Sequence, residues 1–278
     1  MNQSDRAAYF RQLHAQEPLP LVLPNAWDAA SARVIELAGA RAIATTSAGI
    51  AWAYGRGDGQ RLRRDDMIQA IRLIVQTVDV PVTADIEGGY GSGSAHDVAE
   101  TVRAVIDVGA VGVNLEDSPG RDGQPLLAPE VHAERIRAAR ATALAAGGDL
   151  VINARTDVYL LQVGAAGTRF DEAVRRVKIY REAGADCLFV PGVIDAETIA
   201  ALVQAIDGPL NIMAMPGAPS VAQLGQLGVA RVSLGPALAQ AALATTQQAA
   251  RELLEHGTYG TLEQRLPFGT VNDMFAQT

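Results

Sequence analysis

Short runs of apolar residues alternate along the chain with longer segments in which apolar residues recur every three or four positions. The short runs are typical of buried strands, and the longer segments are typical of amphipathic helices. We expect strands at Leu21–Pro24, Ala42–Ser47, Val82–Glu87, Gly112–Asp117, Val151–Thr156, Cys187–Pro191, Leu210–Met215 and Arg231–Gly235. We expect helices between and after them at Asp28–Ala38, Arg63–Val78, Ser94–Val108, Pro129–Ala146, Arg169–Ala183, Ala196–Ala205, Ser220–Leu227 and Pro236–His256.

This succession of eight strand–helix units predicts a parallel sheet closed into a (β/α)8 barrel. An open, doubly wound sheet is the alternative, which the regularity of the units disfavours. No linker divides the 278 residues, so we expect a single domain over residues 1–278. A further helix, Ser4–Gln16, would cover the barrel floor through Ala8, Phe10 and Leu13. The apolar tail Thr258–Thr278 would pack on this subunit or on a neighbour.

The amino-acid composition argues against several classes of function. Apolar residues make up 49% of the chain, which is enough for a large core, and the net charge of −8 argues against a nucleic-acid partner. No apolar run is long enough to cross a membrane and the N-terminus is too polar for a signal peptide, so we expect a cytoplasmic protein. Cys187 is the single cysteine, which excludes an internal disulfide. Lys178 is the only lysine and lies within a predicted helix, which disfavours Schiff-base chemistry.

The candidate chemistry lies at the carboxyl ends of the first five strands, where barrels of this type keep their active sites. Strand alternation turns Asp85, Glu87 and Glu116 into the barrel. Buried carboxylates repel one another unless a positive group neutralises them, and the candidates are Arg155 and a divalent cation. Oxygen ligands of this kind suit Mg²⁺ or Mn²⁺. The same carboxylates could instead form structural salt bridges and helix caps.

Three further features surround these carboxylates. Arg155 also points inward by alternation, and its planar guanidinium could grip a substrate carboxylate, balance Glu116, or do both. The small residues of the segment Ser47-Ala48-Gly49 would let backbone amides approach an anion. Asp58 lies in a long polar excursion, from which it could reach over the site or simply form a surface turn.

Six segments, in this order and spacing, carry a resemblance to a known family. They are Pro24–Ala32, Thr46–Gly49, Gly55–Asp58, Asp85–Gly91, Gly112–Asp117 and Asn153–Asp157. The chain resembles the isocitrate lyase / phosphoenolpyruvate mutase superfamily, in its phosphonomutase-like branch, over most of its length. The resemblance implies a Mg²⁺-dependent α/β barrel that acts on small 2-oxo or 2-hydroxy carboxylates. It also implies a homodimer or homotetramer in which the last helix is exchanged between subunits.

The resemblance implies a role for each acidic candidate. Asp85 would be the innermost metal ligand, Glu87 and Glu116 would hold water molecules on the metal, and Asp58 would help to orient them.

On the substrate side, the resemblance implies that the amides of Ser47, Ala48 and Gly49 cradle a pyruvyl carboxylate while Arg155 binds the substrate's oxygens.

The stretch after the fourth strand departs from the family pattern. Lyases of the isocitrate and methylisocitrate type carry Lys-Lys/Arg-Cys-Gly-His there, whereas residues 118–127 contain no cysteine, histidine or lysine. The Asn-containing lid of the phosphonomutases is also missing from this stretch, and Glu87 stands where Asp is more usual.

These observations favour a Mg²⁺-dependent carbon–carbon lyase or decarboxylase that acts through a pyruvate enolate. Proton transfer would fall to Tyr90, Glu116 or water on the metal. Two other hypotheses stay open. One is a phosphonopyruvate or phosphoenolpyruvate mutase or hydrolase, which would act on a phosphorus–carbon bond, and the other is a metabolite-binding barrel without catalysis.

Overall fold

The strands form a single parallel sheet that closes on itself. The computed structural model describes residues 2–15, 19–120, 124–147 and 150–276, and its nine-stranded sheet has the order β1-β9-β8-β7-β6-β5-β4-β3-β2. The strands are β1 (Leu21–Leu23), β2 (Asn25–Ala26), β3 (Ile43–Thr45), β4 (Val82–Asp85), β5 (Gly112–Glu116), β6 (Val151–Arg155), β7 (Cys187–Phe189), β8 (Leu210–Met213) and β9 (Arg231–Ser233). Every neighbouring pair is parallel.

The first predicted strand, Leu21–Pro24, corresponds to β1, and Pro24 separates β1 from β2, which was not predicted, because proline has no N–H to donate to a sheet. β1 pairs with β9 and β2 pairs with β3, so the two halves of one strand join the ends of the sheet. The side chain of Asn25 supports this junction: its Nδ2 donates to Thr45 O at 2.9 Å, and its Oδ1 accepts from Leu234 N at 2.9 Å. The predicted (β/α)8 barrel is confirmed, and the open sheet is excluded.

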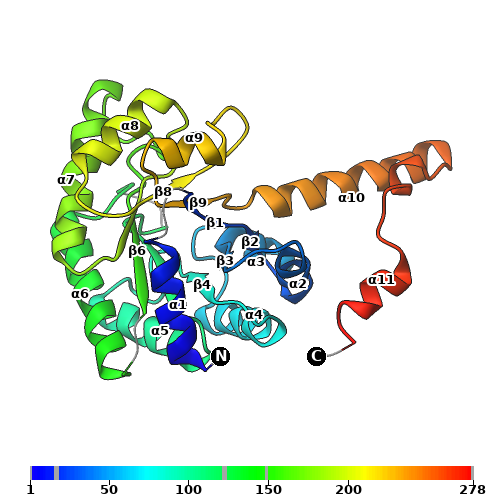
Figure 1. Cartoon of the computed structure of the whole chain (residues 1–278), viewed down its shortest axis with the longest axis horizontal. Coiled ribbons are helices and arrows are strands. Elements are labelled where there is room, and N and C mark those ends of the chain that lie inside the picture. Colours follow the sequence, from blue (N-terminus) through cyan, green and yellow to red (C-terminus); the bar gives the residue numbers. More distant parts are fainter. Residues whose placement is uncertain (1, 16–18, 121–123, 148–149, 277–278) are drawn as a thin grey trace.

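Helices alternate with the strands and surround the barrel (Figure 1). They are α2 (Ala29–Leu37), α3 (Ser47–Ala53), α4 (Arg64–Thr77), α5 (Ala95–Asp107), α6 (Pro129–Ala145), α7 (Arg169–Glu182), α8 (Ala196–Ala205) and α9 (Val221–Gln226), with a short 3-10 turn, η1 (Ala166–Thr168), before α7. Side chains cap several of them as the sequence suggests, for example Asp28 at α2 and Ser94 at α5. The observed strands end earlier than predicted. In particular, Ser47 begins helix α3 rather than ending a strand.

The helix predicted at the N-terminus covers the amino-terminal end of the barrel. It is α1 (Gln3–Leu13), which buries Phe10 and Leu13 against a small core that includes Leu21 and Leu23. Ala7 is buried where Ala8 was expected, because the buried positions of this helix recur every three residues, at Ala7, Phe10 and Leu13. The predicted end of this helix at Gln16 lies outside the described residues.

The last long helix, α10 (Ala237–His256), runs away from the barrel (Figure 1). It is followed by a 3-10 turn, η2 (Gly260–Leu262), and by α11 (Phe268–Asp273). The tail touches its own subunit where Arg33 Nε of α2 donates to Met274 O at 2.8 Å, but Leu254 and Phe268 are 84% and 82% exposed. Within the described residues, none of the helices combines the length and the apolarity that crossing a membrane requires.

Candidate active site

A cavity of about 180 Å³ opens into the barrel from the carboxyl ends of the strands. Its walls carry polar side chains from nearly every strand and from the loops that follow. Those relevant to the chemistry are Thr45, Ser47, Asp58, Thr83, Asp85, Asn114, Asn153, Arg155, Asn211, Arg231 and Ser233. The site therefore lies where the barrel fold predicts it.

Asp85, at the end of β4, is held in one orientation by hydrogen bonds to both carboxylate oxygens. Its Oδ2 accepts from the backbone N of Ser47 at 3.0 Å and from Ser47 Oγ at 2.7 Å. Its Oδ1 accepts from Asn114 Nδ2 at 3.0 Å. The carboxylate thus faces the cavity in a fixed position, which suits a ligand of a cation.

The segment Ser47-Ala48-Gly49 forms the first turn of α3, and Thr46 caps that turn by accepting from Gly49 N at 3.4 Å. Ser47 and Ala48 line the cavity. Gly49 instead packs against Trp27, because a Cβ at this position would lie 2.8 Å from the Trp27 Cβ. The structure therefore brings two of the three residues to the cavity wall and gives the third a packing role.

Arg155, at the end of β6, also lines the cavity and is flanked by two carboxylates. Its Nη1 lies 3.0 Å from Glu116 Oε2, and its Nε and Nη2 donate to Asp157 at 2.5 and 3.1 Å. The guanidinium carbon lies 5.7 Å from the centre of the Phe189 ring. Burial opposes the charge of Arg155, but Asp157 and Glu116 raise its pKa above the ordinary value, so Arg155 stays cationic. The predicted balance of Glu116 by Arg155 is observed.

Glu87 and Tyr90 lie beside the cavity rather than on its wall. β4 ends at Asp85, and Glu87 has a φ of 49°, so the alternation that predicted an inward Glu87 stops before it. Tyr90 OH donates to Glu87 Oε1 at 2.9 Å, and the other oxygen of Glu87 accepts from Gln60 N. Gln60 Nε2 in turn donates to Pro119 O at 2.8 Å, so Gln60 links the loops after β3, β4 and β5.

Negative charge accumulates around this site. Burial raises the pKa of Glu87 to about 7 with help from the charge of Asp85, and burial also raises the pKa of Glu116. At the cavity mouth, loss of hydration and the charge of Asp85 raise the pKa of Asp58. Among the described residues, Arg155 is the only cation in ion-pair contact with any of these carboxylates. A divalent cation would relieve this repulsion.

The donor set fits a hard cation that keeps its water. The described part of the chain contains no group of three or more His, Cys, Asp or Glu side chains that converge as a complete metal cage. Mg²⁺ does not need such a cage, because it is usually bound through one or two carboxylates and retains several waters. Asp85 and Asp58 offer carboxylate oxygens on the cavity wall, and Glu87 and Glu116 lie close enough to influence their charge.

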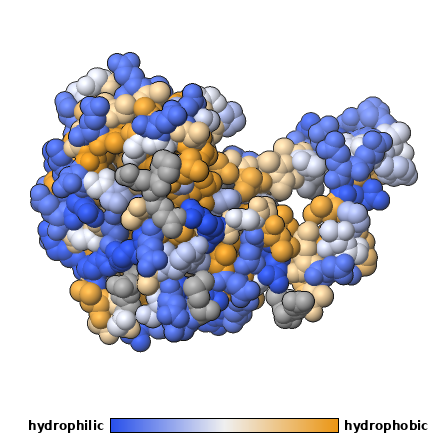
Figure 2. All heavy atoms as spheres, viewed as in Figure 1, coloured by the Kyte–Doolittle hydropathy of each residue, from blue (hydrophilic) through white to orange (hydrophobic). Residues whose placement is uncertain are grey.

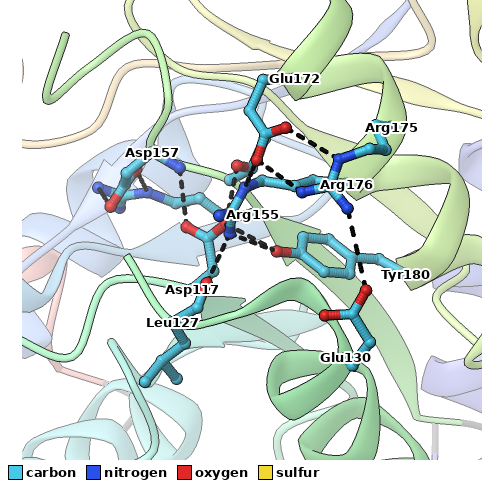
Figure 3. A network of polar contacts seen from close by, with 10 residues as sticks. Asp117, Leu127, Glu130, Arg155, Asp157, Glu172, Arg175, Arg176 and Tyr180 are labelled. Carbon is cyan, nitrogen blue, oxygen red and sulfur yellow. Dashed lines mark hydrogen bonds and ion pairs between the residues drawn. The ribbon is translucent and has the colours of Figure 1, made fainter. Parts of the chain in front are cut away.

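Asp117 belongs to a structural network between the barrel and α7, which reaches Arg155 through Asp157 (Figure 3). Its side chain is completely buried and accepts from Tyr180 OH at 2.7 Å and from Arg176 Nη1 at 3.1 Å, both of α7. It also accepts from Thr156 Oγ1 at 2.8 Å and from Asp157 N at 3.0 Å. Asp117 therefore ties β5 and β6 to α7 and fixes the backbone beside Arg155.

Two polar residues of the cavity, Asn211 and Arg231, were not among the sequence candidates. They face the cavity from β8 and β9, where alternation also directs Met213 and Ser233 inward. Strand alternation predicts that both residues face inward. They lie near the starts of their strands, whereas the candidates in the sequence come from the strand ends.

Comparisons with known proteins agree with this geometry. The sequence model of phosphoenolpyruvate phosphomutase matches residues 10–254. An uncharacterized protein of Mycobacterium tuberculosis (strain ATCC 25618 / H37Rv) is 35% identical over 263 residues, which cover 92% of this chain and 95% of that protein. The 2-methylisocitrate lyase of Escherichia coli (strain K12) is 31% identical over 198 residues, which cover 69% of this chain and 64% of the lyase.

Solved structures give the same result. Oxaloacetate acetylhydrolase in complex with its product oxalate superposes with a TM-score of 0.86 at 27% identity, covering 98% of this chain and 94% of that one. A crystal structure of 2,3-dimethylmalate lyase, a member of the PEP mutase/isocitrate lyase superfamily, superposes with a TM-score of 0.84 at 28% identity, covering 98% of this chain and 95% of that one.

Fold and site together define a (β/α)8-barrel enzyme with a polar cavity at the carboxyl ends of its strands, lined by two carboxylates and two guanidinium groups. The match over residues 10–254 makes the assignment specific. The chain belongs to the phosphoenolpyruvate phosphomutase family, within the isocitrate lyase / phosphoenolpyruvate mutase superfamily of enzymes, as the sequence resemblance predicted. Its relatives 2-methylisocitrate lyase and 2,3-dimethylmalate lyase are carbon–carbon lyases.

Proposed function

We propose that this protein is a Mg²⁺-dependent carbon–carbon lyase or decarboxylase that converts a small 2-oxo or 2-hydroxy carboxylate through a pyruvate enolate. One observation carries the proposal: the fixed carboxylate of Asp85 and the charged guanidinium of Arg155 line the same cavity. Such a pair can serve an anionic substrate that chelates a cation. The names of the relatives, 2-methylisocitrate lyase and oxaloacetate acetylhydrolase, support the same substrate class.

The substrate carboxylate would bind at the first turn of α3. The Ser47 amide already donates to Asp85, whereas the Ala48 amide has no hydrogen bond among the described residues and is available. Gly49 keeps this turn close to Trp27 and so sets its position. Arg155 would bind the substrate's oxygens while Asp157 and Glu116 hold its guanidinium plane.

Asp85 would hold Mg²⁺ (or Mn²⁺) directly. Asp58, Glu87 and Glu116 would accept hydrogen bonds from the water that the ion retains. The bound ion would supply a Lewis acid for the negative charge of an enolate. Tyr90 would fix Glu87 through its 2.9 Å hydrogen bond, because burial and the charge of Glu87 keep the pKa of the Tyr90 phenol well above its ordinary value.

Glu116 is the better-placed proton carrier of the two named candidates. Arg155 brings the Glu116 carboxylate to within 3.0 Å of the guanidinium that would bind the substrate, whereas Tyr90 is engaged with Glu87. Burial raises the pKa of Glu116 and the charge of Arg155 opposes that rise, so both groups set the proton affinity of this carboxylate.

Pyruvate release tests this function. The protein would be incubated with a panel of 2-oxo and 2-hydroxy diacids, first with Mg²⁺ and then after treatment with EDTA. We expect at least one diacid to yield pyruvate with Mg²⁺ and none with EDTA, and Mg²⁺ to restore the rate. A panel without any metal-dependent turnover would exclude the proposal.

Phosphorus–carbon chemistry is a second candidate, because the matching family model is that of phosphoenolpyruvate phosphomutase. Phosphorus NMR on phosphonopyruvate distinguishes the two. A mutase would convert the phosphonate signal into that of a phosphate ester and a hydrolase would release inorganic phosphate, whereas a carbon–carbon lyase would leave the signal unchanged.

We also propose that subunits exchange α10. Figure 2 shows hydrophobic atoms at the root of this helix, where it leaves the barrel, and Leu243, Leu253 and Leu254 are 55%, 51% and 84% exposed. A second apolar surface lies between α2 and α9, where Val22, Val34 and other residues line a groove of about 680 Å³. A homodimer or homotetramer would bury both surfaces.

A further inference from the structure

The deepest part of the cavity contains a buried arginine. Arg231, the first residue of β9, is 2% exposed, and its Nε and Nη1 atoms have no hydrogen-bond partner in the part of the chain that the structure describes. Within the described residues, Arg231 also takes part in no ion pair, unlike Arg155 higher in the same cavity. A buried guanidinium is costly unless an anion or a set of hydrogen-bond acceptors satisfies it.

The neighbours of Arg231 add hydrogen-bond donors rather than a compensating charge. Asn211 is its register partner on β8 and is completely buried. Ser233 Oγ lies 3.4 Å from Asn211 Oδ1, which leaves Asn211 Nδ2 without a partner. Among the described residues, the hydroxyl of Thr83, on the same cavity wall, is also unpaired and can donate or accept. Asn153 Oδ1 is an unpaired acceptor of the same group.

The charge of Arg231 persists at neutral pH. Burial lowers the pKa of Arg231, but only to about 10. The nearest anionic groups that act on it are those of Cys187 and Asp85, and the thiol of Cys187 is neutral because burial raises its pKa to about 11. Asp85 is already engaged with Ser47 and Asn114.

We propose that Arg231 and Asn211 form a second anion-binding subsite at the bottom of the cavity, which takes a carboxylate-sized oxyanion. A planar oxyanion matches the fork of a guanidinium and can accept from the Asn211 amide as well. The oxyanion can come from two sources. It can be the distal carboxylate of a diacid substrate, a source that rests on the proposed function, or a free small anion that occupies the barrel independently of turnover.

Binding experiments on the full chain in EDTA separate these sources without requiring metal or catalysis. Formate is the probe for a free anion. Acetate and malonate form a pair that differs by one carboxylate. Arg231→Met removes the charge while keeping much of the volume. Arg135→Met is the matched control, because Arg135 is 1% exposed and has unpaired nitrogens, yet does not line this cavity.

Two results support the subsite. Formate would raise the Tm of the wild-type protein and of Arg135→Met in a saturable manner but leave Arg231→Met unchanged, which identifies a free anion. Alternatively, malonate would bind at least about tenfold more tightly than acetate, and Arg231→Met would remove that difference, which identifies a distal carboxylate. Equal responses of the wild-type protein and Arg231→Met to all three probes would mean that buried water alone solvates Arg231, and would overturn the proposal.

Asn211→Asp decides the question if Arg231→Met does not fold. This substitution places a carboxylate opposite the guanidinium. We expect it to raise the Tm in the absence of added anion and to abolish the responses to formate and to the second carboxylate of malonate. A lower Tm with intact responses would contradict the subsite. None of these readouts depends on turnover, so a missing lyase activity would refute the proposed function and leave this inference standing.

Discussion

Single residues in this site are fixed by the protein before any substrate arrives. Asp85 is held by Ser47 and Asn114, and Arg155 is held by Glu116 and Asp157. Preorganised charges of this kind contribute to catalysis because they need no reorientation during the reaction. Substitutions at these positions should therefore affect rate more than folding.

Asp85→Asn tests this expectation most directly. The amide keeps the shape of the side chain but removes the charge that would hold the cation. We expect kcat/KM to fall by about 10³-fold and the Mg²⁺-dependent increase in Tm to vanish. Asp107→Asn is the control, because Asp107 lies in an exposed ion pair with Arg103 and should retain both properties. Full activity in Asp85→Asn would rule out its role as the inner metal ligand.

His132 provides a prediction about pH. It is completely buried in α6 beside Tyr180, with ring centres 4.6 Å apart, and burial lowers its pKa well below the ordinary value of 6.5. The unfolded chain therefore binds a proton that the folded chain excludes, so this contribution to stability is lost as pH falls below 6.5.

Urea unfolding at pH 7 and pH 5 measures the effect. The free energy of unfolding of His132→Phe should fall less between these two pH values than that of the wild-type protein, by up to about 2 kcal/mol. His96→Gln should behave as wild type, because the side chain of His96 is 81% exposed. Identical pH slopes for the wild-type protein and His132→Phe would show that His132 is not excluded from protonation by folding.

Elements of secondary structure were predictable where a simple period persists. Alternation along β4, β5 and β6 correctly predicted that Asp85, Asn114 and Arg155 point into the barrel. It failed at Glu87, whose carbonyl still accepts from Glu116 N at 3.0 Å although its φ of 49° turns the chain. The point at which a strand stops depends on backbone hydrogen bonds and loop contacts from elsewhere in the chain, and a local pattern does not contain them.

The buried contacts of Asp117 with α7 give a prediction at the scale of the secondary-structure elements. Asp117→Asn keeps an acceptor for Tyr180 but leaves Arg176 without its buried counter-charge. We expect the free energy of unfolding to drop by about 3 kcal/mol, because removing one partner of a buried pair leaves the other uncompensated.

Glu172→Gln is the matched control for Asp117→Asn. Glu172 also pairs with Arg176, but its side chain is 32% exposed, so its loss should cost less than about 1 kcal/mol. Chemical denaturation of both variants gives the comparison. Equal losses would mean that the Asp117 network contributes no more than a surface ion pair.

At the scale of the whole molecule, α10 projects from the barrel and leaves apolar side chains exposed. Its exposed leucines have no cover in a single subunit, although the tail returns to Arg33 of α2. The sequence indicated this surface through its apolar pattern. The direction in which the helix leaves the barrel depends on packing that the pattern does not encode.

The exchange of α10 predicts a change in assembly. Light scattering should show a dimer or a tetramer for the wild-type protein and a smaller species for a variant with Leu253→Gln and Leu254→Gln, because both leucines are exposed in the single subunit. Glu255→Gln, a neighbouring exposed change, should leave the assembly intact. A monomeric wild-type protein, or a variant of unchanged mass, would contradict the exchange.

The junction at Pro24 connects the wall of the cavity to the closure of the barrel. The Asn25 side chain lines the cavity and also joins the ends of the sheet through Thr45 and Leu234. Local opening of proteins, as hydrogen exchange reports it, starts where few bonds hold the backbone. Any solute that competes for the Asn25 carboxamide would thus loosen the ring as it enters. Local opening of the barrel and binding of a solute in its cavity are therefore linked through the Asn25 carboxamide.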